Sequence, residues 1–219
     1  MKILISYSIS SDIESFLKEI GNEPFVNHFK YKHITIDFVE LGYTSFETAF
    51  KMGKALQKDR YHLVLFAGFA NSLNDRMKVG EVVNVINDIP FGIGTESESG
   101  FQHAYQLGWM DAKKHPHQRG GFINMSNAYF NVFLPFLKTA SITTNILGGN
   151  TETLALKLKL FPIHIESSNG LGFQYACLHE GMPFYQLRAI KENLLDSTNN
   201  KDLASDNLNK GLQQIIDLV

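Results

Sequence analysis

Apolar positions recur along the chain with two different periods, and this pattern predicts an α/β fold. Short runs rich in β-branched residues predict strands at Lys2–Ser6, Ile34–Leu41, Leu63–Ala67, Val82–Ile89, Ile142–Ile146, Ile163–Glu166 and Tyr185–Ile190. Helical spacing predicts helices at Asp12–Ile20, Ser45–Lys58, Asn127–Leu137, Thr151–Leu160, Leu171–Glu180 and Ser205–Leu218. Strands that alternate with helices favour a three-layer α/β/α arrangement around a central mixed, largely parallel sheet.

Two local patterns refine the predicted boundaries. Ser11 is a candidate N-cap of the first helix, and Glu14 three residues later completes a capping box. The segment Asn193–Asn207 is polar enough to predict a mobile loop. No composition shift marks a domain boundary, so we expect one domain over residues 1–219.

Composition and charge narrow the classes of partner. Hydrophobic residues make up 44% of the chain, enough for a two-sided core. The formal charge is −2 and no dense basic tract is present, which argues against a nucleic-acid partner. No apolar stretch approaches the roughly 18 residues of a membrane span, and the first residues lack a signal-peptide pattern. We therefore expect a soluble, cytoplasmic protein with no membrane partner.

Cysteine and histidine give little sign of metal or thiol chemistry. The single cysteine, Cys177, lies on the apolar face of a predicted helix, which indicates a buried thiol. His115 and His117 flank a proline in a polar segment without the further ligands that a zinc site requires, so a surface loop is favoured. We expect no metal and no cofactor.

The most informative stretch is residues 162–190. An apolar run leads into a polar elbow at Glu166 to Asn169, small residues begin a helix, and Gly181 and Pro183 end it before a second apolar run. The elbow thus presents polar side chains at the end of a buried strand. Open α/β sheets bind small ligands at such strand ends.

This stretch resembles the Glu-Ser-Met-Glu-Gly-Ala-Ala … Pro-Phe … Arg-Ala-Ile-Ser signature of the purine nucleoside phosphorylase and nucleosidase superfamily, within which futalosine hydrolases are the most similar. Two further segments support the resemblance. Leu63-Val-Leu-Phe-Ala-Gly-Phe-Ala-Asn with the later Gly-Glu-Val-Val-Asn-Val is similar to the futalosine hydrolase pattern, and so is the acidic, glycine-containing loop from Phe91 to Trp109. The resemblance implies a nucleoside phosphorylase-like fold and a homo-oligomer, dimer or higher.

The resemblance also implies roles for particular residues. Asp12 aligns with the acid that orients the attacking water, although the family commonly has the longer Glu there. Asn169 occupies the position of the acid that holds the ribose hydroxyls, and Glu166 and Ser168 flank it. Glu192 aligns with the Asp or Asn that faces the purine, with Lys191 before it. Gly68, Phe69 and Ala70 would let the ligand lie against the backbone.

These assignments imply hydrolysis of futalosine to hypoxanthine and dehypoxanthine futalosine in menaquinone biosynthesis, with a small-molecule purine nucleoside as partner. Phosphorolysis is disfavoured because the first strand is followed by serines without an arginine to hold phosphate. Two alternatives stay open. One is a non-catalytic homologue that binds a nucleoside for regulation, since all three catalytic positions are altered. The other is an enzyme for a different N-riboside whose acid has moved to Glu14 or Glu96.

Overall fold

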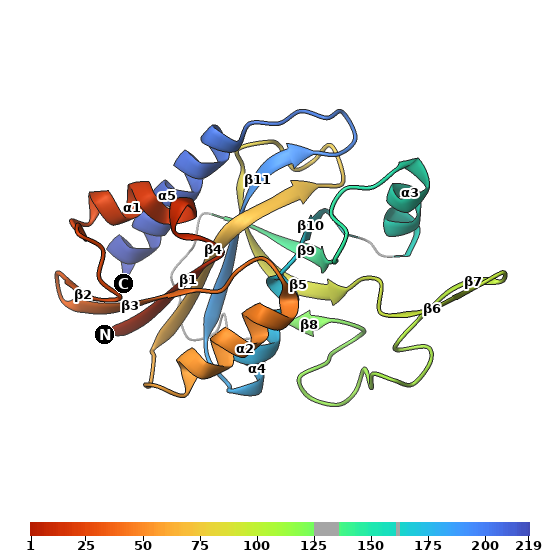
Figure 1. The fold of residues 1–219 in the computed structure, drawn as a ribbon, viewed down its shortest axis with the longest axis horizontal. Coiled ribbons are helices and arrows are strands. Elements are labelled where there is room, and N and C mark those ends of the chain that lie inside the picture. The colour runs from red at the N-terminus through yellow and green to blue at the C-terminus, as the bar shows by residue number, and fades with distance from the viewer. Residues whose placement is uncertain (125–135, 161–162) are drawn as a thin grey trace.

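The computed structural model describes residues 1–124, 136–160 and 163–219, and their elements alternate much as the pattern predicts (Figure 1). The helices are η1 (Ser10–Ile13), α1 (Glu14–Glu19), α2 (Ser45–Leu56), α3 (Thr151–Leu160), α4 (Gly170–His179) and α5 (Lys201–Leu218). The long strands are β1 (Lys2–Tyr7), β3 (Ile34–Glu40), β4 (Leu63–Ser72), β5 (Val82–Pro90), β9 (Leu137–Thr143) and β11 (Phe184–Asn193). The short strands are β2 (His28–Tyr31), β6 (Gly94–Ser97), β7 (Gly100–His103), β8 (Phe122–Ile123) and β10 (Ile165–Ser167).

The main sheet is mixed, as predicted, but it partly closes on itself, and antiparallel pairings are nearly as common in it as parallel ones. Its strand order is β10-β9-β5-β11-β4-β1-β3-β2, and β10 pairs a second time with β4. Strands β4, β11, β5, β9 and β10 therefore form a closed ring, from which β1, β3 and β2 extend. The closure depends on the length of β4, because residues 63–67 pair with β1 while residues 71 and 72 pair with β10.

Helices cover both faces of this sheet, as predicted. Helices α1 and α5 pack against one face over a core that includes Ile5, Phe16 and Leu212. Helices α2 and α4 lie together on the other face, where Phe66, Phe173 and Phe184 form the core. The α3 helix lies apart from both pairs (Figure 1).

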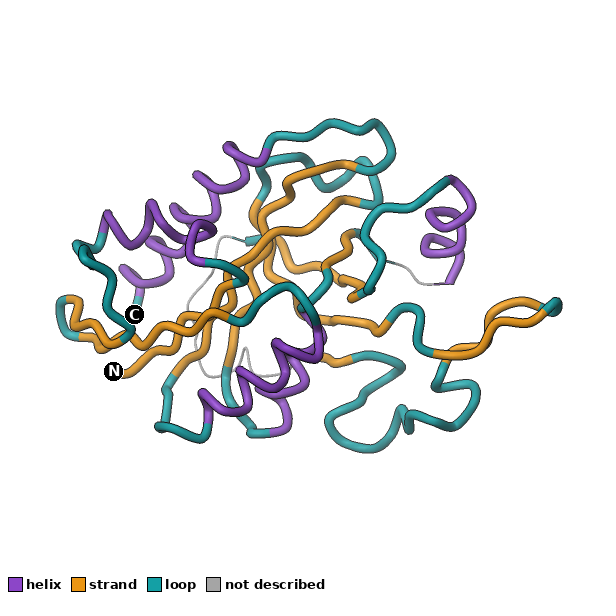
Figure 2. Tube along the Cα trace, viewed as in Figure 1, coloured by secondary structure: helices purple, strands orange, loops and turns teal. Residues whose placement is uncertain are grey.

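A long segment that contains β6, β7 and β8 separates β5 from β9 in the sequence. The strands β6 and β7 pair only with each other in the described residues and project from the body as a two-stranded arm (Figure 2). Neither strand is expected from the sequence, because residues 94–103 are polar and lack apolar alternation. Within the described ranges, no helix combines the length and apolar character needed to cross a bilayer.

Several predicted boundaries are wrong. The segment Asn193–Asn207 is not one mobile loop, because α5 begins at Lys201 with the Asn200 side chain accepting from the Leu203 N–H. Ser11 does not cap the first helix. Instead, residues 10–13 form a 3₁₀ turn in which the Asp12 carboxylate accepts from the Ile9 N–H.

The region before β9 also differs from the prediction. The strand predicted at Ile142–Ile146 lies earlier, at Leu137–Thr143. Most of the helix predicted at Asn127–Leu137 lies outside the described residues, and Leu137 itself begins β9.

Candidate functional site

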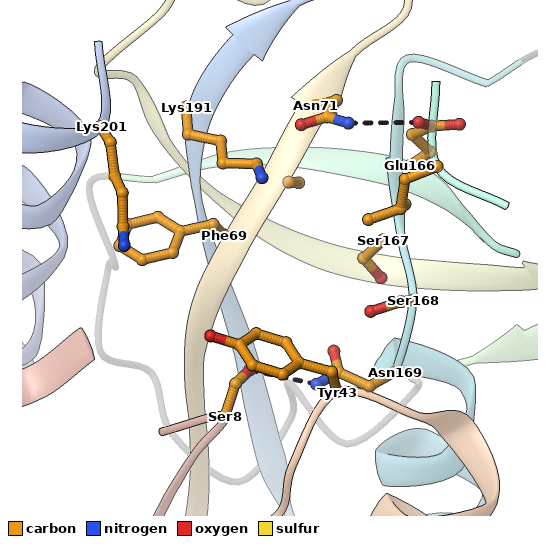
Figure 3. A pocket seen from close by; sticks show the side chains of 12 residues that line it. Ser8, Tyr43, Phe69, Asn71, Glu166, Ser167, Ser168, Asn169, Lys191 and Lys201 are labelled. Atoms are coloured by element: carbon orange, nitrogen blue, oxygen red, sulfur yellow. Dashed lines mark hydrogen bonds between the residues drawn. The ribbon is translucent and has the colours of Figure 1, made fainter. Parts of the chain in front are cut away.

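A cavity lined by both polar and apolar side chains lies where the carboxyl ends of β1, β4, β10 and β11 meet (Figure 3). It encloses ≈ 130 Å³. Strands β1, β4 and β11 run parallel to one another, so their carboxyl ends lie at the same edge of the sheet. The lining residues come from seven segments of the chain: Ser8, Tyr43, Phe69, Ala70, Asn71, Leu147, Glu166, Ser167, Ser168, Asn169, Lys191 and Lys201.

The structure gathers most of the predicted ligand-binding residues at this cavity. Phe69 and Ala70 line it from β4, and Glu166, Ser168 and Asn169 line it from β10 and the turn before α4. Gly68 does not line it. A Cβ atom at Gly68 would lie 2.4 Å from Nη1 of Arg188, so this glycine makes room for the arginine.

Two buried polar atoms in the cavity wall lack a partner within the described part of the chain. These are Oδ1 of Asn71 and the hydroxyl of Ser167. Buried polar atoms in native proteins nearly always have a hydrogen-bond partner, and exceptions call for a physical reason. A bound ligand with polar groups of its own would supply these partners.

Glu166 is fully buried and its carboxylate is already occupied. One oxygen accepts from Lys157 Nζ at 2.6 Å, and the other accepts from the Gly148 N–H at 2.5 Å and from Asn71 Nδ2 at 3.2 Å. Lys157 also donates to the carbonyl oxygens of Ile146 and Gly148. The pair ties α3 and the turn before it to β10, and it neutralises the only carboxylate that the described residues contribute to the lining.

Asn169 is held by three hydrogen bonds. Its Nδ2 donates to the Gly42 carbonyl at 2.7 Å and to the Ser8 hydroxyl at 3.1 Å, while its Oδ1 accepts from Arg188 Nη2 at 3.0 Å. Both amide hydrogens are therefore used within the protein. A ligand hydroxyl can reach Asn169 only as a donor to Oδ1.

Arg188 is the positioning group behind Asn169. The residue is 1% exposed, and Cζ of its guanidinium lies 4.2 Å from the centroid of the Phe66 ring. Burial lowers the pKa of Arg188 to about 10, and the nearby carboxylates of Asp88 and Asp12 oppose that shift. The residue remains a cation at neutral pH and fixes the orientation of the Asn169 amide.

Asp12 lies behind the cavity wall rather than in it. Its side chain is 2% exposed, and burial raises its pKa, an effect opposed by the Ile9 N–H and by the charges of Lys201 and Arg188. Asp12 also interacts electrostatically with Tyr43, which lines the cavity. A raised pKa makes a carboxylate a stronger base, and a general base must also be within hydrogen-bond reach of the water that it activates.

A β-bulge decides which residue after Arg188-Ala-Ile faces the cavity. In the pairing of β11 with β4, Ile190 lies opposite Ala70 and Glu192 opposite Asn71, so Lys191 is an extra residue. Lys191 lines the cavity and Glu192 does not. Bulges re-aim side chains in this way next to many active sites.

The other candidates lie away from the cavity lining. Glu14 is exposed and pairs with Lys18, and Glu96 is exposed on the β6–β7 arm. His115 and His117 bond the Leu178 carbonyl and the Tyr105 hydroxyl, respectively, and the described residues contain no metal-ligand cluster. Cys177 is buried, as predicted, and burial raises its pKa well above the usual value.

Sequence reasoning assigned no role to several contributors to the site. Lys157 and Lys201 sit on helices as ordinary basic residues, and Tyr43 and Leu147 belong to no motif that we recognised. Ser8, Asn71 and Ser167 lie in segments that we singled out, but they received no role there. The signal available for Ser8 was its place directly after the first strand. No sequence signal marks Lys157, because its partner Glu166 lies on another element.

Comparison with known proteins agrees with the resemblance at the level of fold. No protein-family model and no curated relative matches the sequence. A 5′-methylthioadenosine-bound nucleosidase variant from Helicobacter pylori superposes with a TM-score of 0.77 at 14% identity, covering 100% of this chain and 99% of the other. The methylthioadenosine/S-adenosylhomocysteine nucleosidase of Campylobacter jejuni gives 0.77 at 13% identity, covering 100% and 98%.

A futalosine hydrolase gives a comparable match. The native enzyme of Helicobacter pylori superposes with a TM-score of 0.75 at 14% identity, covering 100% of this chain and 98% of the other. The structural neighbours thus span the two kinds of nucleosidase over their full length. The chain therefore shares the fold of these nucleosidase and futalosine hydrolase structures.

Proposed function

We propose that this chain binds a purine nucleoside or a derivative of one in the cavity and hydrolyses its N-ribosidic bond. The observation that carries the proposal is the pair of unpartnered buried atoms, Asn71 Oδ1 and the Ser167 hydroxyl, in a cavity at the carboxyl edge of a nucleosidase-type sheet. A nucleoside offers hydroxyl and ring nitrogen groups that match such atoms.

Hydrolysis requires a water molecule directed at the anomeric carbon. We assign its activation to Asp12, which the resemblance places at the water-orienting position and which interacts electrostatically with the cavity-lining residues Tyr43 and Lys201. Because Asp12 does not itself line the cavity, its side chain must turn toward the cavity to reach the water. A general base of this kind contributes about 10²–10⁴-fold to the rate. Substitution of Asp12 by Asn removes the base and keeps the side-chain shape.

In this proposal, the turn between β10 and α4 binds the ribose. Asn169 Oδ1 retains one acceptor site beside its bond from Arg188, and the hydroxyls of Ser167 and Ser168 line the same wall. Phe69 provides an apolar surface for the sugar or the base. Glu166 contributes indirectly, by holding Asn71 in place.

Futalosine is the first substrate to test, because the sequence resembles futalosine hydrolases and one such enzyme superposes on the whole chain. The panel of compounds to test after futalosine consists of 5′-methylthioadenosine, S-adenosylhomocysteine, adenosine and inosine. We expect release of the free base from at least one compound, and we expect Asp12→Asn to slow release by about 10²-fold or more. Release from no compound would contradict hydrolysis.

A second function, nucleoside binding without catalysis, is favoured by one specific observation. The charge of Glu166 is neutralised by Lys157, and Asn169 replaces the family's ribose-binding acid, so no lining carboxylate is left to stabilise a cationic sugar. Measurable binding of a nucleoside by calorimetry, with no base released over days, would establish this function in place of hydrolysis.

A further inference from the structure

The cavity carries a surplus of positive charge that nothing in the proposed reaction requires. Lys191 and Lys201 both line it, and neither ammonium group has a hydrogen-bond or ion-pair partner in the part of the chain that is described. The one lining carboxylate, Glu166, is already paired with Lys157. The two unpaired lysines therefore set the charge that a ligand meets.

Both ammonium groups are positioned by the fold. Lys191 is the extra residue of the β11 bulge, which directs its side chain toward the cavity (Figure 3). Lys201 is the first residue of α5, and its Nζ lies 5.9 Å from the centroid of the Phe69 ring. A cation within about 6 Å of an aromatic face is attracted to it.

The other nearby carboxylates, Asp12, Glu40 and Asp88, lie outside the cavity lining. Asp12 acts on Lys201 through space, but it is not within ion-pair distance and also faces Arg188. The charge of Arg188 is opposed by Asp88 and Asp12 from behind the cavity wall. Glu192 follows Lys191 in the sequence but does not line the cavity.

We propose that the cavity selects an anionic nucleoside, one that bears a negative charge on its ribose or its base, and that Lys191 and Lys201 are the charge partners. This inference rests on the proposed nucleoside site and names its ligand class. A phosphate ester and an ionised base share the same chemistry toward two ammonium groups.

Matched ligand pairs test the proposal by calorimetric titration. Adenosine 5′-monophosphate is compared with adenosine, and xanthosine, whose base ionises near neutral pH, is compared with inosine. We expect at least one anionic member to bind about tenfold or more tightly than its neutral partner, a difference worth 1.4 kcal/mol. The preferred pair identifies whether the ribose or the base carries the charge. Added salt should reduce the preference.

Lysine variants connect the preference to the two side chains. Lys191→Met and Lys201→Met should each lower the affinity for the anionic ligand about threefold to tenfold, as expected for partly screened charge pairs. Neither substitution should change the affinity for the neutral ligand. Lys210→Met, an exposed position on the same helix as Lys201, is the matched control and should change neither.

Three outcomes would overturn the inference. Equal affinity for the anionic and neutral members of both pairs would do so, and so would an anion preference that survives both lysine substitutions. Inorganic phosphate that binds as tightly as adenosine 5′-monophosphate would show an ion site without nucleoside recognition. Base release from neutral nucleosides, together with no anion preference, would leave the proposed hydrolysis standing while this inference fails.

Discussion

At the scale of single residues, much of the buried charge stabilises the site rather than facing the ligand. Glu166 and Lys157 neutralise each other, and Arg188 is committed to Asn169. Asp88 accepts from Thr143 and Gln186 beneath the start of α4. Such groups are costly when one partner is lost, because a buried charge is then left uncompensated.

The Lys157–Glu166 pair gives a direct stability prediction. Lys157→Met should destabilise the protein by about 3–5 kcal/mol, because Glu166 would remain buried without its counter-charge. The double variant Lys157→Met/Glu166→Gln should recover part of this loss. Urea unfolding measures both values. A single-variant loss no greater than that of an exposed lysine such as Lys210 would show that the pair is not buried as described.

The buried carboxyl group of Asp88 should make the stability of the protein depend on pH. Burial raises its pKa to about 6, above its value in the unfolded chain, so the folded state holds the proton more tightly. The resulting stabilisation is complete below the unfolded pKa and is lost as the pH rises through about 6.

Asp88→Asn should therefore raise the melting temperature at pH 8 and have little effect at pH 4. Two pKa units correspond to roughly 3 kcal/mol. The Gln186 side-chain oxygen has no partner among the described residues, so a flipped Gln186 amide can accept from the new Asn side chain. If the melting temperatures of the variant and the original protein differed by the same amount at pH 4 and pH 8, this would contradict the raised pKa of Asp88.

The sequence anticipated the residue types around the cavity but not their connections. The polar elbow Glu166–Asn169 was found because it follows a β-branched run directly. That Glu166 is neutralised by Lys157, or that Lys191 rather than Glu192 lines the cavity, depends on the placement of α3 and on one bulge. Neither feature produces a periodic pattern of apolar and polar residues in the sequence.

At the scale of elements, α4 packs against the start of α2 through a glycine. A Cβ atom at Gly172 would lie 2.1 Å from the Ser45 carbonyl oxygen, so any larger residue must push the two helices apart. This contact keeps the start of α4, and with it the turn that holds Asn169, close to the sheet.

Two glycine-to-alanine substitutions test this packing. Gly172→Ala should destabilise the protein by about 1–3 kcal/mol, as overpacked sites do. Gly53→Ala, in α2 with no atom near its added Cβ, is the control and should stabilise by about 0.5–1 kcal/mol through helix propensity. Denaturant unfolding of both variants is the measurement, and a stable Gly172→Ala protein would contradict the close contact.

Element types were predictable where the hydrophobic pattern was strong. Strands β1, β3 and β5 lie almost where the pattern put them, and α3 matches its predicted range. The arm of β6 and β7 and the early start of α5 were missed, because their residues are polar and their order comes from pairing and capping.

At the scale of the whole molecule, α2 exposes an apolar surface of the kind that subunit interfaces bury. Phe46 and Phe50 are 78% and 66% exposed and lie four residues apart on one helix face. We therefore expect the homo-oligomer implied by the resemblance to use this face. Light scattering should give a dimer or larger species, and Phe46→Ser/Phe50→Ser should shift it toward monomer; an unchanged mass would exclude this face.

We expect a nucleoside to bind in the cavity of the partly closed sheet, where β1, β4, β10 and β11 meet. The most direct test is a crystal structure of the protein soaked with the tightest-binding nucleoside of the panel. We expect density for the nucleoside against Phe69, with polar contacts to Asn71, Ser167 or Asn169. A nucleoside found elsewhere on the molecule, or a cavity that holds only water at saturating ligand, would contradict it.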